Sequence, residues 1–427
     1  MSRCVVIGHS IYAVKALEQL RSEFPEMELV ICAQEPGLPY DRNRFVEVLA
    51  KRIERHEIYY RSEDFYRNLR IQFVTDQKVG RIHFKRKYIT FEDNTKLDFD
   101  RLIIANWEKD DWPELKGLTK RGVFSLRTIE QLDEFLKMSS QLDTVAVQTN
   151  TLRGVRIAQA LALRTKDVVL SVSGDRLLSG VISEEASRWL DQLLRQMGIR
   201  ILYQCSVTEV LGENDVRAVR LAIGKVIGCE AVVFADVGPD CRFFERFDLR
   251  CDPFISVNEM MQASETDVFA LDQMVRPSGH PSEFSGEDEA LLNWQVRALM
   301  AGFLKRDGEG PVSVCDALFD IGSHHISIWG RGRSSENGFE YRRMISENAG
   351  CILALDENMM VDSVMTVDVD DRKAVLPVDD FSISLSEQAL AEYSQVFRQD
   401  SPAVETPVED VPADLNSKEE LSKQDVF

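Results

Sequence analysis

Short runs of consecutive apolar residues alternate along the chain with stretches in which apolar residues recur every three or four positions. The first pattern is typical of strands buried on both faces of a parallel sheet, and the second is typical of the helices that cover such a sheet. One unit runs from "CVVIG" through residues 11–22 to "MELVICAQE", and another runs from "DTVAVQT" through residues 153–164 to "KDVVLSVSG". Each unit spans about 30 residues, as a parallel crossover requires. The pattern therefore predicts an α/β protein with two Rossmann-like domains.

Helix boundary signals and a change of pattern complete this outline. In "FSLRTIEQLDEFLKM", Thr128 is predicted to cap a helix and Gln131 to complete a capping box. A second amphipathic helix is predicted to begin after Ser183 and to stop at Gly198. From residue 311 onward the segments "ISIWGRG", "FEYRRMI", "GCILALD" and "MMVDSVMTVDV" predict a small β-rich third domain.

Composition and charge narrow the classes of partner. The 427 residues carry a net charge of −20, which repels phosphates, so nucleic acids and anionic membranes are excluded and a protein partner is expected. No apolar run approaches the roughly 18 residues that span a bilayer, and no signal-peptide pattern precedes the first strand. The chain is therefore predicted to be cytoplasmic, with no membrane span. Residues 381–427 are predicted to form an acidic, largely disordered tail, with a short-motif interaction as the alternative.

The cysteines and histidines give no sign of a metal centre or a catalytic thiol. The eight cysteines are widely spaced, and none forms a CxxC pair or a metal-ligand cluster. They are interpreted as reduced, buried thiols. His324 and His325 are adjacent, so on a strand they point to opposite faces and do not easily share one metal. No metal site and no catalytic residue are predicted.

Several segments, taken in their order and spacing, resemble one family of reductases. They are "EPGLPYDRNRF", "LDFDRLIIA", "GVFSLRTIEQLDEFL", "DRLLSGVISEEASRWLDQLLRQMGIRI" and "SETDVFALDQM". Over residues 3–375 the chain resembles the FAD-dependent pyridine nucleotide-disulfide oxidoreductases of the rubredoxin reductase, ferredoxin reductase and nitrite reductase large-subunit type. The resemblance implies an FAD-binding-type domain over 1–110 and 238–310, an NAD(P)-binding-type domain over 111–237 and a C-terminal interface-like domain over 311–380. It also allows a homodimer through the C-terminal domain.

The first nucleotide turn keeps part of the pattern that the resemblance implies for FAD binding. Gly8, Ser10 and Ala13 stand at the three glycine positions, of which the second normally lets the backbone approach the pyrophosphate. Ser10 is the serious change, because alanine is tolerated at the third position. Glu35 matches the acid that holds the adenosine ribose, and Arg42 matches a cofactor-contacting arginine.

Three further positions around the implied flavin depart from the family. Glu47 stands where the family has a lysine near the flavin ring, Trp107 replaces a glycine, and Leu271 replaces the glycine before an aspartate. That aspartate, Asp272, matches the residue that contacts the ribityl chain, with a helix cap as the alternative role. If each of these changes and Ser10 weakens FAD binding by about 1–3 kcal/mol, the affinity falls roughly a thousandfold or more.

The second nucleotide turn departs further. Thr149 and Thr151 stand at the first two glycine positions, and only Gly154 matches. Val172 replaces the acid expected at the end of the following strand, so ribose recognition is expected to be absent. Three arginines are interpreted as solvated, or alternatively as a phosphate or carboxylate site. They are Arg153, Arg156 and Arg176.

These departures lead to a functional hypothesis. FAD is expected to be bound weakly or not at all, and NAD(P)H binding is not expected. The chain is interpreted as a degenerate homologue that acts as a non-catalytic scaffold or partner-binding component of a redox-related complex. One alternative is an active FAD-dependent NAD(P)H oxidoreductase that passes electrons to a rubredoxin-like acceptor. Another is a sensor that uses the remodelled clefts for a different small molecule.

Overall fold

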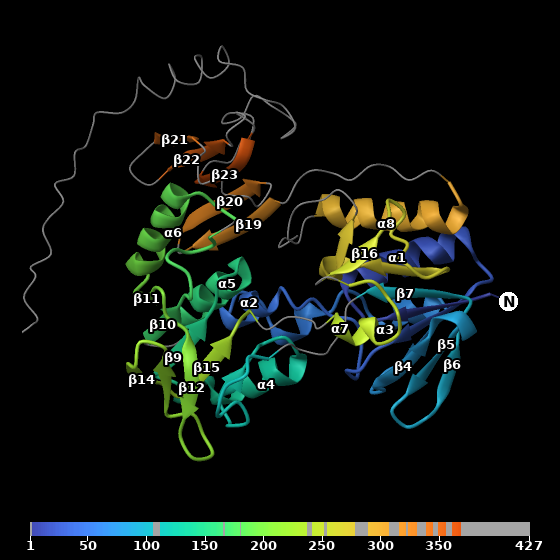
Figure 1. Cartoon of the computed structure of the whole chain (residues 1–427), viewed down its shortest axis with the longest axis horizontal. Helices are drawn as coiled ribbons and strands as arrows, with labels where there is room; N and C mark the ends of the chain where they lie inside the picture. Colours follow the sequence, from blue (N-terminus) through green and yellow to red (C-terminus); the bar gives the residue numbers. More distant parts are fainter. Residues whose placement is uncertain are drawn as a thin grey trace, which may run out of the picture.

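The computed structural model contains two α/β units and a β-rich unit (Figure 1), which confirms the predicted fold class. The structure describes residues 2–105, 112–164, 167–179, 181–236, 241–251, 254–277, 289–306, 316–321, 323–330, 339–344, 349–355 and 361–368. Trp107 and the predicted acidic tail over 381–427 lie outside these residues. The domain boundaries given above stay a prediction.

The first unit is built on a parallel sheet in the order β17-β7-β1-β2-β3. Its strands are β1 (Arg3–Ile7), β2 (Glu28–Cys32), β3 (Ile71–Val74), β7 (Arg101–Ala105) and β17 (Val268–Leu271). Helices α1 (Ile11–Glu23) and α8 (Glu289–Leu304) contact each other and the sheet (Figure 1). The first unit is therefore discontinuous in sequence, because β17 and α8 come much later in the chain than its other main elements.

The first unit also contains shorter elements. The helical turns are α2 (Phe45–Leu49), η1 (Arg55–Ile58), α3 (Glu63–Asn68), η2 (Phe84–Arg86), α7 (Arg242–Glu245) and η4 (Asp272–Met274). The strands are the antiparallel set β4 (Val79–His83), β5 (Tyr88–Phe91) and β6 (Lys96–Asp98), and the parallel pair β16 (Ile255–Val257) and β18 (Val275–Pro277).

The second unit repeats the parallel architecture, in the order β11-β10-β9-β15-β8. Its strands are β8 (Val123–Phe124), β9 (Thr144–Gln148), β10 (Asp167–Ser171), β11 (Arg200–Leu202) and β15 (Ala231–Phe234). Its helices are α4 (Ile129–Met138), η3 (Ser139–Gln141), α5 (Leu152–Ala162) and α6 (Glu184–Gln196). An antiparallel sheet of β12 (Val207–Leu211), β13 (Ala218–Leu221) and β14 (Val226–Gly228) is attached to it.

The predicted helix caps are present, but the predicted capping box is not. Thr128 caps α4 by accepting from the amide of Gln131 at 3.3 Å, and Ser183 caps α6 through its side chain. The side-chain oxygen of Gln131 accepts instead from the amides of Ser125 and Leu126, each at 2.8 Å. Leu126 has a positive φ of 54°, so the chain turns back toward the helix start and brings these amides within reach.

The β-rich unit is an antiparallel sheet in the order β19-β20-β23-β22-β21. Its strands are β19 (Asp316–Ile321), β20 (His324–Gly330), β21 (Phe339–Met344), β22 (Gly350–Leu355) and β23 (Val361–Val367). Buried residues of this sheet, Ile326, Ile352 and Met365 among them, belong to the same apolar cluster as the core of the second unit. Figure 1 shows the sheet lying above α5 and beside α6.

A segment of the first unit is also packed into the second. Tyr40, Phe45 and Ile58 share an apolar cluster with residues of the second sheet and its helices. Arg164, just after α5, donates from Nη2 to the carbonyl of Val48 at 3.0 Å and so caps the end of α2. Burying aromatic residues and capping carbonyls across this junction fixes the two nucleotide-type sheets relative to each other.

In the part of the chain that the structure describes, no helix is long and apolar enough to cross a bilayer.

Candidate functional site

The first predicted turn joins β1 to α1 as the sequence indicates. Gly8 has a φ of +96°, a conformation that L side chains rarely adopt, and its amide donates to the carbonyl of Cys32 at 2.8 Å. Ala13 is fully buried on α1, where a small side chain permits close packing of the helix on the sheet. The turn therefore retains the geometry in which a helix N-terminus faces the carboxyl edge of a parallel sheet.

Ser10 gives this turn an unusual polar group. It is the N-cap of α1, is 9% exposed, and makes no side-chain cap hydrogen bond. Its hydroxyl has no hydrogen-bond partner among the described residues, and leaving a buried hydroxyl unsatisfied costs about 1–3 kcal/mol. Because the amides at a helix start attract anions, a phosphate oxygen there would satisfy the hydroxyl as well.

Glu35 is held at the same edge of the sheet by three donors, one of which is the amide of Ile129, 3.5 Å from Oε2. The residue is 7% exposed, and Arg42 donates from Nη2 to its Oε1 at 2.7 Å. The hydroxyl of Tyr40 donates to the other carboxylate oxygen and accepts from the amide of Ile129 at 3.1 Å. An ionised carboxylate only accepts hydrogen bonds, which is the property that binding a ribose hydroxyl requires. Through Tyr40, this carboxylate is also linked to the first residue of α4 in the second unit.

His9 fills the space between the turn and this carboxylate. It is 2% exposed, and its ring packs edge-on against Tyr40 with a centroid distance of 5.1 Å. The pKa of His9 is lowered from 6.5 to about 4, mainly by burial and then by the nearby Arg42, while Glu35 opposes the shift. The imidazole is therefore neutral at neutral pH, and it adds no charge to the turn.

This buried imidazole predicts a specific loss of stability in acid. Because the folded pKa lies below the unfolded value, the unfolded state binds more protons between pH 6.5 and about 4. Stability is thus full above pH 6.5 and falls as the pH drops through that window, by on the order of 3 kcal/mol in total. His9→Gln should remove this part of the loss in denaturant titrations at pH 7 and pH 4.5. His56→Gln, at an exposed position, is the control, and an equal effect of both variants would contradict the assignment.

Asp272 reaches the same edge from β17. It is the first residue of η4, whose N-cap is Leu271, so the helix-cap role does not fit the geometry. Its amide donates to Oε1 of Gln295 at 2.7 Å, which fixes its φ of 75°. Burial raises the pKa of Tyr60, and the nearby charges of Asp41 and then Asp272 raise it further.

The structure removes most of the reasons for which FAD binding appeared blocked. Leu271 is fully buried in the apolar core of the first unit rather than exposed at its edge. Glu47 is paired with Arg44 at 3.1 Å, so its charge is balanced within its own helical turn. Ser10 provides an unsatisfied hydroxyl at a helix start. Trp107 lies outside the described residues. The residues present therefore fit a dinucleotide phosphate and ribose at this edge.

The second turn, between β9 and α5, is held by hydroxyl groups. Thr151 caps α5 by accepting from the amide of Gly154 at 3.4 Å. A Cβ on Gly154 would lie 2.0 Å from Oγ1 of Thr149, so the matching glycine serves the close packing of helix on strand. Val172 is fully buried and supplies no polar group after β10.

An acidic side chain binds the donors of this turn. Asp236, which follows β15, accepts from the hydroxyl of Thr149 at 2.5 Å, from the amide of Asn150 at 2.7 Å and from the hydroxyl of Thr151 at 2.9 Å. Asn150 is joined to Ser173 by two further hydrogen bonds, at 2.7 and 3.1 Å. The donors of this turn thus bind the carboxylate of Asp236 in the folded chain. The same donors would fit the oxygens of a nucleotide phosphate.

The three arginines noted in the sequence have separate surroundings. Arg153 donates to the backbone carbonyls of Ser125, Leu126 and Ala235 at 2.8–3.1 Å, so its role is structural rather than solvated. Arg156 is half-buried on α5, and Arg176 lines a cavity beside α6. A phosphate or carboxylate site at Arg156 and Arg176 stays a prediction.

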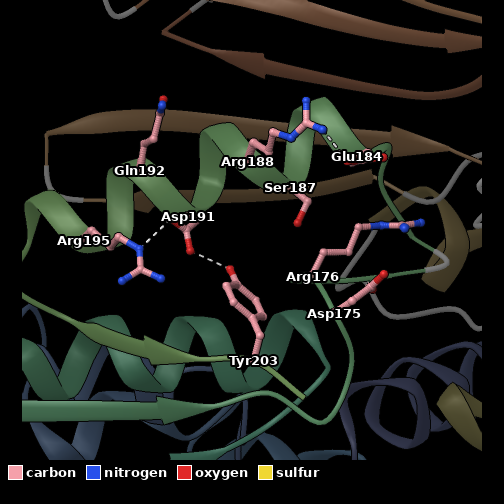
Figure 2. A pocket seen from close by; sticks show the side chains of 9 residues that line it. All are labelled: Asp175, Arg176, Glu184, Ser187, Arg188, Asp191, Gln192, Arg195 and Tyr203. Carbon is pink, nitrogen blue, oxygen red and sulfur yellow. Dashed lines mark hydrogen bonds and ion pairs between the residues drawn. The ribbon is translucent and has the colours of Figure 1, made fainter. Parts of the chain in front are cut away.

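The cavity beside α6 has a volume of about 430 Å³. Its lining residues come from one face of α6, from the segment after β10 and from the segment after β11 (Figure 2): Asp175, Arg176, Glu184, Ser187, Arg188, Asp191, Gln192, Arg195 and Tyr203. Two pairs of these charges are joined within the cavity, Asp191 with Arg195 and Glu184 with Arg188. Asp191 also accepts from the hydroxyl of Tyr203 at 2.6 Å. Burial, and then the bond to Asp191, raises the pKa of Tyr203. The cavity is therefore polar and has little net charge.

Four of the described cysteines are poor candidates for a redox thiol. Burial raises the pKa of Cys4, Cys32, Cys229 and Cys251 to about 12 in each case, so these thiols are protonated at neutral pH. No described group of three or more histidine, cysteine, aspartate or glutamate residues has a metal-binding arrangement.

Comparison with known proteins places these two turns in context. Residues 2–281 match the model of the pyridine nucleotide-disulphide oxidoreductase family. The chain is 24% identical over 279 residues to an assimilatory nitrate reductase electron transfer subunit of Bacillus subtilis, a match covering 65% of this chain and only 36% of that protein. It is 22% identical over 327 residues to a benzene 1,2-dioxygenase system ferredoxin–NAD(+) reductase subunit of Pseudomonas putida, covering 76% and 80% of the two chains.

A solved structure shows the same fold. The covalent putidaredoxin reductase–putidaredoxin complex contains a chain that superposes with a TM-score of 0.78 at 19% identity, covering 93% of this chain and 99% of that one. The fold similarity thus extends beyond the residues that match the family model, into the β-rich unit.

The expectations on cofactors are wrong. The sequence led to FAD bound weakly or not at all and to no NAD(P)H binding. The matching family and the related reductases point instead to FAD and a nicotinamide nucleotide as the cofactors. The error arose because the size and charge of these side chains were taken to block the FAD site. In the structure, Leu271 is buried in the core, and the charge of Glu47 is paired with Arg44.

Proposed function

The chain belongs to the pyridine nucleotide-disulphide oxidoreductase family, and on that premise we propose that it is an active FAD-dependent NAD(P)H oxidoreductase. Its electron acceptor is a small electron-transfer protein of the ferredoxin or rubredoxin kind. The observation that carries the proposal is the edge of the first sheet, where an unsatisfied buried hydroxyl at a helix start lies in the same site as a buried, oriented carboxylate. The scaffold and sensor hypotheses have no comparable observation in their favour.

The residues of the first edge have separable roles in this proposal. Ser10 and the start of α1 bind the pyrophosphate, and Glu35, oriented by Arg42, accepts from the adenosine ribose. His9 keeps water out of the turn while remaining neutral. FAD, when bound, supplies the acceptance of a hydride and the release of single electrons. Asp272 is the residue that orients the flavin end.

The thiols favour direct transfer of electrons to a protein acceptor. A disulfide reductase needs a reactive thiolate, and the raised pKa of Cys4, Cys32, Cys229 and Cys251 opposes that chemistry at these four thiols. Reductases that serve ferredoxins are among the relatives of this chain. The net charge of −20 implies that docking of the acceptor depends on salt concentration.

The proposal is tested by steady-state oxidation of NADH and NADPH by the FAD-reconstituted protein with ferricyanide as an artificial acceptor. Turnover that depends on added FAD supports it. A folded protein that binds FAD but oxidises neither nucleotide, at concentrations well above those in cells, would contradict it.

Ser10 provides a second expected result. Ser10→Ala removes a hydroxyl that has no partner in the fold, so the thermal stability of the FAD-free protein should not fall. The dissociation constant for FAD should rise about tenfold, because one hydrogen bond to a phosphate is lost. Ser62→Ala is the matched control, since Ser62 is an exposed N-cap of α3 that also lacks a side-chain cap bond. Equal FAD affinity of both variants, measured by flavin fluorescence, would remove Ser10 from the site.

A further inference from the structure

Asp236 occupies the hydrogen-bond donors of the second nucleotide turn. Its two carboxylate oxygens accept three hydrogen bonds, from the hydroxyls of Thr149 and Thr151 and from the amide of Asn150, at 2.5–2.9 Å. These donors lie at the start of α5, where the helix dipole and the amides attract an anion. The carboxylate is exposed, so it lies at the surface where a ligand would approach.

We infer that Asp236 determines affinity at the NAD(P)H site, because its carboxylate holds the donors that the pyrophosphate of the nucleotide needs. This inference rests on the proposed function. A bound pyrophosphate has to displace the carboxylate from the turn or lie beside it, and two anions in contact repel each other. The wild-type protein therefore binds NAD(P)H more weakly than a variant that is neutral at this position.

The turn does not need the carboxylate to keep its structure. Thr151 caps α5 itself, through its bond from the amide of Gly154. The hydroxyl of Thr149 also lies 3.3 Å from the carbonyl of Thr151, and the amide of Thr151 donates to that hydroxyl at 2.9 Å. Removing the charge of Asp236 thus leaves the hydroxyl groups with partners inside the turn, and the helix keeps its cap.

The chain offers a matched control at the opposite end of the same strands. Glu230 immediately precedes β15, whereas Asp236 follows it, and Oε2 of Glu230 accepts from the amides of Asp143 and Thr144 at 3.1 and 2.8 Å. Glu230→Gln therefore makes the same change of charge, at an acid that also binds backbone amides, but at the amino edge of the sheet.

The experiment measures binding and turnover in the FAD-loaded protein for four forms: wild type, Asp236→Asn, Asp236→Ser and Glu230→Gln. Dissociation constants for NADH and NADPH are measured by titration calorimetry, and folding is checked by thermal melting. Both variants of Asp236 should lower the dissociation constants and KM by about tenfold or more, with little change in kcat. Glu230→Gln should leave the dissociation constants, KM and kcat close to their wild-type values.

The outcomes separate this inference from the proposed function. If wild type oxidises NAD(P)H but folded Asp236→Asn and Asp236→Ser bind it no more tightly, the inference is overturned and the proposed function stands. If the Asp236 variants bind more tightly while no form oxidises NAD(P)H, the inference stands and the proposed function fails. If Glu230→Gln raised the affinity for NAD(P)H by the same factor, the effect would come from the overall charge of the protein, and the inference would also be overturned.

Discussion

Replacing Glu35 with alanine is expected to destabilise the protein by about 3–5 kcal/mol, because it leaves the guanidinium of Arg42 buried without its carboxylate partner. Both side chains of this pair are largely buried, at 12% and 8% exposure, and the carboxylate also binds Tyr40. FAD affinity should fall at least a hundredfold, since the ribose loses its acceptor and the orientation of Arg42 is lost. Denaturant titration and flavin fluorescence measure the two effects.

A surface ion pair provides the control for this prediction. Glu28 pairs with Arg3 at 2.9 Å, and both side chains are about a third exposed. Such pairs contribute about 0–1 kcal/mol, so Glu28→Ala should change stability little and FAD affinity not at all. If Glu35→Ala and Glu28→Ala gave the same small loss of stability and unchanged FAD affinity, Glu35 would have no special role.

Gly154→Ala is expected to disrupt the second turn, with a loss of about 3 kcal/mol. The added Cβ would lie 2.0 Å from Oγ1 and 2.3 Å from Cβ of Thr149, and an overpacked contact of this kind forces the backbone to move. Binding of NAD(P)H should fall in parallel, because the start of α5 is displaced from the sheet. Thermal melting and nucleotide titration measure the two effects.

A double variant tests whether Thr149 is the cause. Thr149→Gly removes the three atoms nearest to the new Cβ, so Gly154→Ala should cost far less in that background, with a coupling of about 2 kcal/mol. Gly228→Ala on β14 is the control, since the nearest atom to its added Cβ is 4.0 Å away. If the stability losses of the two single variants simply added in the double variant, the contact with Thr149 would not be the cause of the loss in Gly154→Ala.

Much of the fold could be predicted because its signals are local. The run "CVVI" before Gly8 and the run "AVVF" before Asp236 are strands buried on both faces, and each is followed by a turn at the carboxyl edge. The helix predicted over residues 153–164 lies within two residues of α5. Its start differs by one residue because Thr151 caps it, a signal that was present in the sequence but was taken only as a lost glycine.

The site was harder to predict because it depends on contacts between distant residues. The link from Glu35 through Tyr40 to Ile129 joins positions far apart in the chain, and nothing local indicates it. Leu271 appeared to be an obstruction because the sequence gives its size but not its direction. Arg44, three residues before Glu47, was a local signal that the charge of Glu47 is balanced. Asp236, two residues after a buried strand, was missed for lack of any motif.

In the proposed function, the first site binds FAD and the bound flavin is reduced by a nicotinamide nucleotide. The most direct test is the visible absorbance spectrum of the protein reconstituted with FAD and freed of excess flavin, recorded before and after anaerobic addition of NADH or NADPH. We expect equimolar flavin whose absorbance bands bleach on addition of the nucleotide. A folded protein that stays colourless after incubation with FAD, or a bound flavin that neither nucleotide reduces, would contradict it.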